Sequence, residues 1–258
     1  MSVRERAVTG GLQTVAAALD LLDCFAEDEE LGVTEVSRRL NVAKSTAHRL
    51  LVTLTSRNIC EQNPRTGKYR LGLHLYELGQ LAVTRTELRR CARSLLEELR
   101  EVTGWAVQLS VTSGVDTLVL ERLMTTRSVK ALPDFNRRLP GNVTAHGKAL
   151  CAFDPDFARR RIEAGLPGPT EFSITDPKLF RAELEVIRRR GYATATGEAM
   201  PGVSSVAAPV LDSRGIAIAA LAINGPPSEI VPMTARLGRL LQAAGRRLAK
   251  DMRADILR

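Results

Sequence analysis

Between residues 38 and 70 the chain carries eight basic side chains and one acidic side chain. The bases are Arg38, Arg39, Lys44, Arg49, Arg57, Arg65, Lys68 and Arg70, and the acid is Glu61. The full chain of 258 residues has 37 basic and 29 acidic residues, so this segment holds most of the net charge of +8. Concentrated positive charge is typical of a surface that binds polyphosphates, although a solvated basic face has the same composition.

A helix from about Lys44 to Ser56 would position several of these charges. Its buried side is predicted by apolar residues at helical spacing, namely Ala47, Leu50, Leu51 and Leu54. The polar residues Lys44, Ser45, Thr46, His48 and Arg49 then lie at its start or on its exposed side. A cation at a helix N-terminus opposes the helix dipole at a cost of about 0.3–1 kcal/mol, which a bound anion would offset. The alternative is that Ser45 or Thr46 caps the helix and Lys44 is solvated.

Two short extended runs, 59–62 and 68–71, follow this helix and flank the turn residues 63–67 (NPRTG). Arg65, Thr66 and Lys68 would lie at the tip of the resulting hairpin. Upstream, residues 12–26 predict a helix with the apolar stripe Leu12, Val15, Leu19, Leu22 and Phe25, and Thr34 is the expected N-cap of a helix over 35–40. Three helices and a hairpin predict a winged helix-turn-helix.

The nucleic acid that such a domain would bind can be narrowed from the composition. Aromatic residues are only 4% of the chain, and Tyr69 is the only aromatic among the cations. Single strands and RNA are bound largely by stacking on aromatic side chains, so double-stranded DNA is the predicted partner.

After this region the pattern predicts a helix from residue 73 to about 102, in two pieces near 84–87, and then one α/β domain with a mostly antiparallel sheet. The expected strands are 105–111, 117–122, 128–132, 192–196, 203–211 and 216–224. The expected helices are 145–153, two that begin at Asp154-Pro155 and Asp176-Pro177, the second ending at Gly191, and one from 234 onward.

Catalytic chemistry in this second half receives little support. Five residues separate Gly141 from Gly147, and Ala149 replaces the hydroxyl that a phosphate-binding loop needs. Ser204-Ser205 lacks the glycine frame of a nucleophile elbow. Cys24, Cys60, Cys91 and Cys151 form no metal-binding pair. We expect no cofactor and no metal; an enzyme that transforms a small molecule near His146 is the alternative.

The chain has no segment typical of export or membrane insertion. Its longest apolar run, 216–223, is far short of the roughly 20 residues that span a bilayer. The N-terminus has charges without an apolar stretch behind them, unlike a signal peptide. We therefore expect a cytoplasmic protein with reduced thiols and no membrane partner.

Several stretches, in this order, resemble a known family. They are 32–54 (GVTEVSRRLNVAKSTAHRLLVTL), 69–72 (YRLG), Leu139-Pro140 followed by 145–150 (AHGKAL), 185–192 (EVIRRRGY), 202–210 (GVSSVAAPV) and 223–226 (INGP). From about residue 12 to 250 the chain resembles the IclR-type transcriptional regulators. Asn58 stands where that family usually has glycine, and asparagine tolerates the same left-handed turn.

The resemblance implies an α/β (α+β) fold: a winged helix-turn-helix over residues 1–72, a linker helix over 73–90, and a GAF-like effector-binding and oligomerisation domain over 91–258. It implies a regulator that binds double-stranded operator DNA as a homodimer or a dimer of dimers, controlled by a small-molecule effector such as a carboxylate or an aromatic acid. The expected DNA-binding residues are Thr34, Lys44, Ser45, Thr46, Arg49, Arg65 and Lys68.

The same resemblance implies an effector pocket lined by Ser128, Ala131, Leu139, Ala145, His146, Val203, Ser205, Ala222 and Asn224. His146 could bind a carboxylate or a phenol there, or it could be a core histidine. The family often has an acidic residue near Ala195, where this chain has the uncharged Thr194-Ala195-Thr196. The predicted pocket is therefore less polar than that of some relatives.

Overall fold

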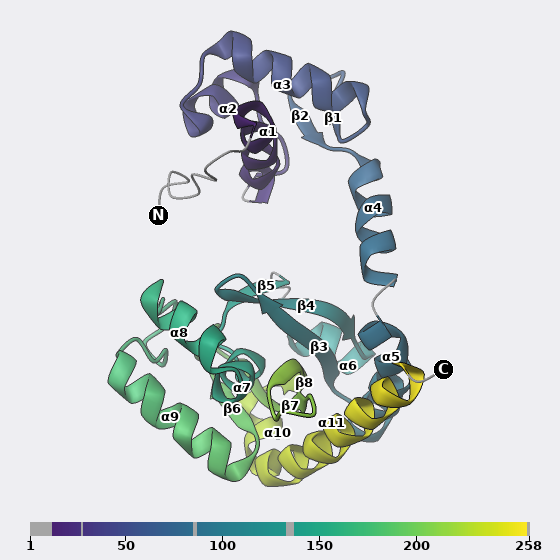
Figure 1. Ribbon diagram of the computed structural model, residues 1–258, viewed down its shortest axis with the longest axis vertical. Helices are drawn as coiled ribbons and strands as arrows, with labels where there is room; N and C mark the ends of the chain where they lie inside the picture. The colour runs from purple at the N-terminus through teal and green to yellow at the C-terminus, as the bar shows by residue number, and fades with distance from the viewer. Residues whose placement is uncertain (1–11, 27, 85–86, 133–136, 257–258) are drawn as a thin grey trace. The chain divides into compact units, whose positions relative to one another are not determined.

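The first part of the chain forms three helices and a hairpin (Figure 1). The computed structural model describes residues 12–26, 28–84, 87–132 and 137–256, with side chains except at 80–84, 87, 131 and 253–256. The chain folds as two compact units, residues 1–85 and 86–258. The elements of the first unit are α1 (Gln13–Asp23), the 3-10 turn η2 (Cys24–Ala26), α2 (Val33–Leu40), α3 (Lys44–Ser56), β1 (Cys60–Gln62), β2 (Tyr69–Leu71) and α4 (Leu73–Thr84).

The predicted winged helix-turn-helix is confirmed, because local signals and the core agree. Asn41 ends α2 at φ 53°, and Asn58 follows α3 at φ 57°, both in the left-handed conformation that asparagine tolerates. Leu31 pairs with Tyr69 beside the antiparallel hairpin β1–β2. The core of this unit consists of Leu21, Phe25, Leu31, Val36, Ala47, Leu50, Leu51, Cys60 and Tyr69.

One local expectation in this unit is wrong and another is confirmed only in part. Thr34 does not cap α2, since the helix already includes Val33 and the Glu35 carboxylate accepts the N–H of Gly32 at 2.8 Å. The apolar stripe predicted over 12–26 reaches the core only at its C-terminal end. Phe25 is buried and Leu22 packs against the core, whereas Leu12, Val15 and Leu19 are 77%, 53% and 60% exposed.

The second unit is built on a six-stranded sheet in the order β5-β4-β3-β8-β7-β6, with every neighbouring pair antiparallel, as expected. The strands are β3 (Ala106–Ser113), β4 (Asp116–Leu123), β5 (Arg138–Pro140), β6 (Ala193–Thr196), β7 (Ser204–Leu211) and β8 (Ala217–Gly225). Around it lie α5 (Glu87–Thr103), α6 (Thr126–Ala131), α7 (Ala145–Phe153), α8 (Pro155–Glu163), α9 (Pro177–Arg190), α10 (Pro227–Ile230), η3 (Val231–Met233) and α11 (Thr234–Ile256).

The two faces of this sheet carry side chains of different size. Helices α5 and α11 cover a face of larger residues, among them Val107, Leu109, Val206, Leu221 and Ile223. Helix α7, with α8 and α9 beside it, covers a face of alanines: Ala193, Ala195, Ala207, Ala220 and Ala222 (Figure 1). Small side chains let α7 approach the sheet closely. A Cβ on Gly147 would lie 2.4 Å from the carbonyl oxygen of Gly141, so only glycine fits there.

Most of the predicted elements of the second unit are confirmed. The Asp154 and Asp176 side chains cap α8 and α9, and Gly191 ends α9 at φ 80°. The strand predicted at 128–132 is wrong: this stretch belongs to α6, because Thr125 and Ser128 form a capping box that starts a helix. The predicted break near 84–87 agrees with the ends of α4 and α5, and residues 85–86 lie outside the described part.

The expected linker, 73–90, covers α4 and the first residues of α5. Helix α5 packs into the core of the second unit through Leu95, Leu96 and Leu99. Among the described residues, no helix is both long and apolar enough to cross a membrane.

Candidate functional site

The exposed side of α3 presents the polar residues expected there. Lys44, Ser45, Thr46 and Arg49 are all exposed at the start of the helix, while Ala47, Leu50 and Leu51 turn toward the core. No carboxylate within the described residues pairs with the side chain of Lys44 or Arg49. Two positive charges therefore remain available to an external anion. Thr34 is exposed in the first turn of α2.

Hydrogen bonds to Glu30 hold the wing turn, residues 63–67, in place, and the sequence did not predict them. Glu30 accepts hydrogen bonds from Asn63 Nδ2 at 2.5 Å and from Thr66 Oγ1 at 2.9 Å, and these bonds lower the pKa of its carboxyl. Asn63 Oδ1 in turn accepts the N–H of Arg65 at 2.9 Å. Glu30 lies more than 30 residues before the turn, so no local pattern marks this contact. The result is an ordered turn that exposes the Arg65 side chain.

Some of the basic residues between 38 and 70 form ion pairs within the protein and are therefore less available to bind an external anion. Arg39 pairs with Asp28, Arg70 Nε lies 2.6 Å from Glu61 Oε1, and Lys68 Nζ lies 3.8 Å from Glu35 Oε2. Lys68 remains exposed, and its ion pair is long, so it can still reach a phosphate. Tertiary structure thus divides the basic segment into internal ion-pair partners and free cations.

A cavity of about 50 Å³ lies in the second unit beside the N-terminal turn of α7. Its walls are Leu139, Val143, Thr144, His146, Ala195, Glu198, Ala199, Met200, Val203, Ser205 and Asn224. Five predicted effector residues are brought together here: Leu139, His146, Val203, Ser205 and Asn224. The volume admits about four water-sized groups, far less than the roughly 300 Å³ of a typical drug-sized site.

Three of the other four predicted pocket residues do not line this cavity. Ala145 and Ala222 are buried but do not line the cavity. Ser128 is buried in the first turn of α6, where its hydroxyl bonds to the backbone of Thr125. Ala131 ends α6, and its side chain lies outside the described part.

His146 is held in one protonation state and one tautomer. Its Nε2 lies 3.1 Å from Thr117 Oγ1, and Thr117 donates its own hydroxyl hydrogen to the carbonyl of Leu139 at 2.9 Å. The imidazole must therefore donate through Nε2–H, which leaves Nδ1 as a hydrogen-bond acceptor. Burial, with a smaller contribution from the nearby Arg122 charge, lowers the pKa of His146 to about 4. The ring is neutral at physiological pH.

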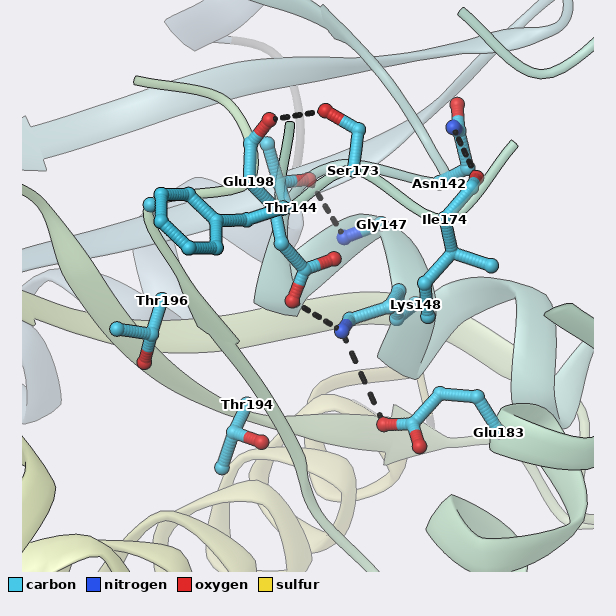
Figure 2. Close-up of polar contacts among 12 residues, drawn as sticks. Asn142, Thr144, Gly147, Lys148, Ser173, Ile174, Glu183, Thr194, Thr196 and Glu198 are labelled. Atoms are coloured by element: carbon cyan, nitrogen blue, oxygen red, sulfur yellow. Dashed lines mark hydrogen bonds and ion pairs between the residues drawn. The ribbon is translucent and has the colours of Figure 1, made fainter. Parts of the chain in front are cut away.

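A buried lysine of α7, Lys148, pairs with a glutamate of α9 and with Glu198 of the cavity wall (Figure 2). Lys148 Nζ lies 2.7 Å from Glu198 Oε1 and 3.8 Å from Glu183 Oε1 of α9. Burial raises the pKa of Glu198, and the Lys148 charge opposes that shift. The Glu198 carbonyl also accepts hydrogen bonds from Ser173 Oγ at 2.7 Å and Thr170 Oγ1 at 3.1 Å. The loop at 198–200 is therefore tied to α7 and to the 164–176 segment.

Sequence reasoning assigned no role to Lys148 or Thr144 and did not place Glu198 at the cavity. A lysine inside the otherwise apolar helix AHGKALCAF was a usable signal, because buried lysines need a partner. Its partner, Glu198, lies 50 residues away in the chain and could not be identified from the sequence.

The chain matches two family models, "IclR helix-turn-helix domain" over residues 14–64 and "Bacterial transcriptional regulator IclR C-terminal" over residues 80–250. The HTH-type transcriptional regulator BhcR of Paracoccus denitrificans is 35% identical over 220 residues, covering 84% of this chain and 79% of that relative.

Two solved structures resemble the chain over nearly its whole length. The crystal structure of an IclR transcriptional regulator from Silicibacter is 30% identical, with a TM-score of 0.80 and coverage of 93% of this chain and 96% of its own. An IclR homologue from Microbacterium hydrocarbonoxydans, complexed with 4-hydroxybenzoate, is 28% identical, with a TM-score of 0.77 and coverage of 93% and 99%.

Fold, exposed cations and these matches define a helix-turn-helix transcriptional regulator. The chain belongs to the IclR family.

The lowered pKa of His146 predicts how stability depends on pH. The unfolded chain protonates this histidine near its ordinary pKa of 6.5, whereas the folded chain does so only near 4. The contribution is fully present above pH 6.5 and is lost as pH falls from 6.5 to 4, by up to about 3 kcal/mol. The fluorescence of Trp105, the single tryptophan, reports unfolding of this unit in denaturant titrations.

The matched variant is His146→Gln, whose amide nitrogen can still donate to Thr117 but does not titrate. Its free energy of unfolding should fall less steeply than that of the wild type between pH 6.5 and 4. Parallel curves for the two proteins would contradict the assignment of a neutral, buried imidazole.

The ion pair between Lys148 and Glu198 predicts a non-additive stability cycle. Lys148→Met leaves the Glu198 carboxylate buried without its partner and should cost about 3–5 kcal/mol. Adding Glu198→Gln removes that charge and should recover a large part of the loss. A double variant that is as unstable as the sum of the single variants would show that the two groups are not coupled.

Proposed function

We propose that this protein binds double-stranded operator DNA through α3 and the wing, and that a small molecule in the cavity beside α7 changes its affinity for DNA. The observation that carries the proposal is a set of exposed cations on the start of α3 and the wing tip, Lys44, Arg49 and Arg65, which pair with no carboxylate in the part of the chain that the structure describes. A helix whose N-terminal residues are polar and whose opposite side is anchored can enter the major groove.

Each exposed polar residue has a proposed role on DNA. Lys44, Ser45, Thr46 and Arg49 enter or border the major groove. Arg65 and Lys68 contact the phosphate backbone, and Thr34 borders it from the start of α2. The ordered turn of the wing supports the role of Arg65, because a cation on a rigid turn loses less conformational freedom on binding.

A homodimer, or a dimer of dimers, would supply paired half-sites, since one winged helix buries too little surface for tight specific binding. Exposed apolar residues support such an assembly. Leu12 at the start of α1, Val15 and Leu19 within it, and Leu73 and Tyr76 of α4 are all more than half exposed. Apolar side chains gathered on a helix favour a protein partner, and a second copy of this chain presents the same ones.

The proposed effector is a small carboxylate, such as an aliphatic or aromatic acid. The first turn of α7 forms one wall of the cavity, and the N–H groups of a helix N-terminus favour an anion. The Microbacterium neighbour was solved in complex with 4-hydroxybenzoate, which supports an acid as the effector. We place the protein in the cytoplasm, where a regulator meets the chromosome.

The contacts of His146 favour a binding pocket over an enzyme. Thr117 donates to the Leu139 carbonyl and not to the imidazole, so His146 does not act as a base toward this hydroxyl.

The double variant Lys44→Ala with Arg65→Ala tests the DNA-binding face. We expect affinity for the gene's own upstream region to fall on the order of tenfold or more, and the slope of log K against log salt to decrease by about 2 per chain. Gel retardation at several salt concentrations measures both effects.

The matched control removes two exposed cations from the second unit, Lys178→Ala with Arg236→Ala. It changes the net charge equally and should leave the salt slope unchanged. Wild-type affinity and slope in the Lys44 and Arg65 variant would exclude this face as the DNA-binding surface.

A further inference from the structure

A groove of about 480 Å³ lies in the second unit between the last turn of α9 and the middle of α11. The C-terminal end of α9 lies beside α11 there (Figure 1), and Gln242 Nε2 of α11 donates to the carbonyl of Arg190 at 2.9 Å. Within the described chain, no residue lines both this groove and the cavity beside α7. The volume falls within the roughly 300–1,000 Å³ of typical ligand sites, so the groove can hold more than solvent.

Four apolar residues line the groove: Phe153 of α7, Pro209 and Leu211 of β7, and Ala249 of α11. Strand β6 pairs with only the first half of β7, so none of the described strands continues along that edge beside Pro209 and Leu211. Proline has no N–H to donate to an added strand, and a Cβ on Gly245 would lie 2.6 Å from the Pro209 carbonyl oxygen, so α11 already approaches that oxygen closely. The groove is therefore suited to receive an apolar side chain and not a further strand.

Basic side chains stand on two sides of these apolar residues. On the α9 side, Arg188 Nε donates to the carbonyl of Ala152 at 2.5 Å and its Nη1 bonds to Glu185, so the guanidinium is held in place. On the α11 side, Arg246 and Lys250 are exposed and pair with no carboxylate in the stretches that the structure describes. An occupant of the groove would meet cations on both sides.

The acidic residue that lines the groove, Asp212, does not neutralise these cations, because its oxygens are already bonded. Its Oδ1 accepts the N–H groups of Arg214 and Ile216, each at 2.9 Å, and its Oδ2 lies 2.9 Å from Arg214 Nη2. These hydrogen bonds, above all the one from Ile216, lower the pKa of the Asp212 carboxyl. Charge complementarity therefore favours a negatively charged occupant beside Arg188, Arg246 and Lys250.

The cations of α11 extend beyond the groove. Arg239 is exposed and lies on the same helix face as Gln242 and Arg246, because residues three and four apart share a face. From Arg239 to Lys250 the row is about 16 Å long. A small anion would meet only part of this row and would stay largely solvated, whereas small-molecule sites bury most of their ligand. A DNA backbone has phosphates for the cations but no apolar side chain to occupy the groove.

We propose that this groove binds an acidic segment of a partner protein, in which one large apolar side chain stands between carboxylates. The apolar side chain packs against Phe153, Pro209 and Leu211, while carboxylates on either side of it pair with Arg188 and with the α11 cations Arg246 and Lys250. Such an anchor in a pocket, surrounded by complementary charges, is how a few residues supply most of the affinity of a protein interface. The second unit thereby gains a protein-docking surface in addition to the proposed DNA and effector functions.

Labelled peptides test the proposal on the full-length protein by fluorescence anisotropy. The first peptide has one phenylalanine between two short runs of glutamate, the second has serine in place of that phenylalanine, and the third has lysine in place of every glutamate. We expect the second to bind about tenfold more weakly than the first, and the third not to bind. Equal affinity of the first two peptides would overturn the proposal, because charge alone would then account for binding. No binding of the first peptide at roughly 0.1 mM protein and low ionic strength would overturn it as well.

A pair of charge-matched variants locates the binding. Arg246→Glu with Lys250→Glu should weaken the first peptide at least about tenfold, since two attractive contacts become repulsive. Lys178→Glu with Arg236→Glu changes the net charge equally at exposed positions that do not line the groove, and should retain wild-type affinity. Equal losses in the two variants would refute binding at the groove. Thermal unfolding shows whether each variant folds, and the wild-type peptide series decides the matter if the groove variant does not.

Binding of operator DNA by the same two variants separates a protein partner from a nucleic acid. Affinity and salt slope of the Arg246 and Lys250 variant should equal those of the Lys178 and Arg236 variant. A smaller salt slope in the groove variant alone would assign these cations to DNA and overturn the proposal of a protein partner. Loss of operator binding by the wild type contradicts the proposed function and leaves the peptide result unaffected.

Discussion

The close seating of α7 on the alanine face of the sheet is the constraint on which the second unit depends. Gly147 contacts the backbone of Gly141 so closely that a methyl group would not fit. The small alanine side chains of β7 and β8 leave room for α7 to pack close to the sheet. This contact fixes the first turn of α7, and with it His146, at the cavity. Lys148, which follows Gly147 in α7, is buried as well, which makes an internal carboxylate partner necessary.

Charge pairing has different consequences in the two units. In the first unit Glu30 accepts hydrogen bonds from the wing turn, and Glu35 and Glu61 pair with Lys68 and Arg70. Cations that have no carboxylate partner among the described residues can bind an external polyanion. In the second unit the Lys148–Glu198 pair is enclosed, and one oxygen of Glu198 remains unpaired on a residue of the cavity wall. Ion pairs thus order the surface of one unit and define the polarity of a site in the other.

Neutral His146 connects the fold to recognition. A charged imidazole would attract any small anion, whereas a buried neutral ring with a defined tautomer distinguishes donors from acceptors. The loop at 198–200 forms another wall, and it is bonded to α7, α9 and the 164–176 segment through Glu198, Lys148 and Ser173 (Figure 2). An occupant that bonds to Glu198 therefore acts on a junction of several elements.

Local patterns in the sequence determined α3, the wing turn, the caps at Asp154 and Asp176 and the antiparallel strands, because these depend on neighbours within a few residues. Resemblance to a family supplied five of the residues that line the cavity. Tertiary structure alone decided that Leu12, Val15 and Leu19 face outward, that Glu30 holds the wing turn, and that Lys148 meets Glu198. Each of these depends on what a side chain packs against across the fold, and periodicity or spacing along the chain carries no record of that.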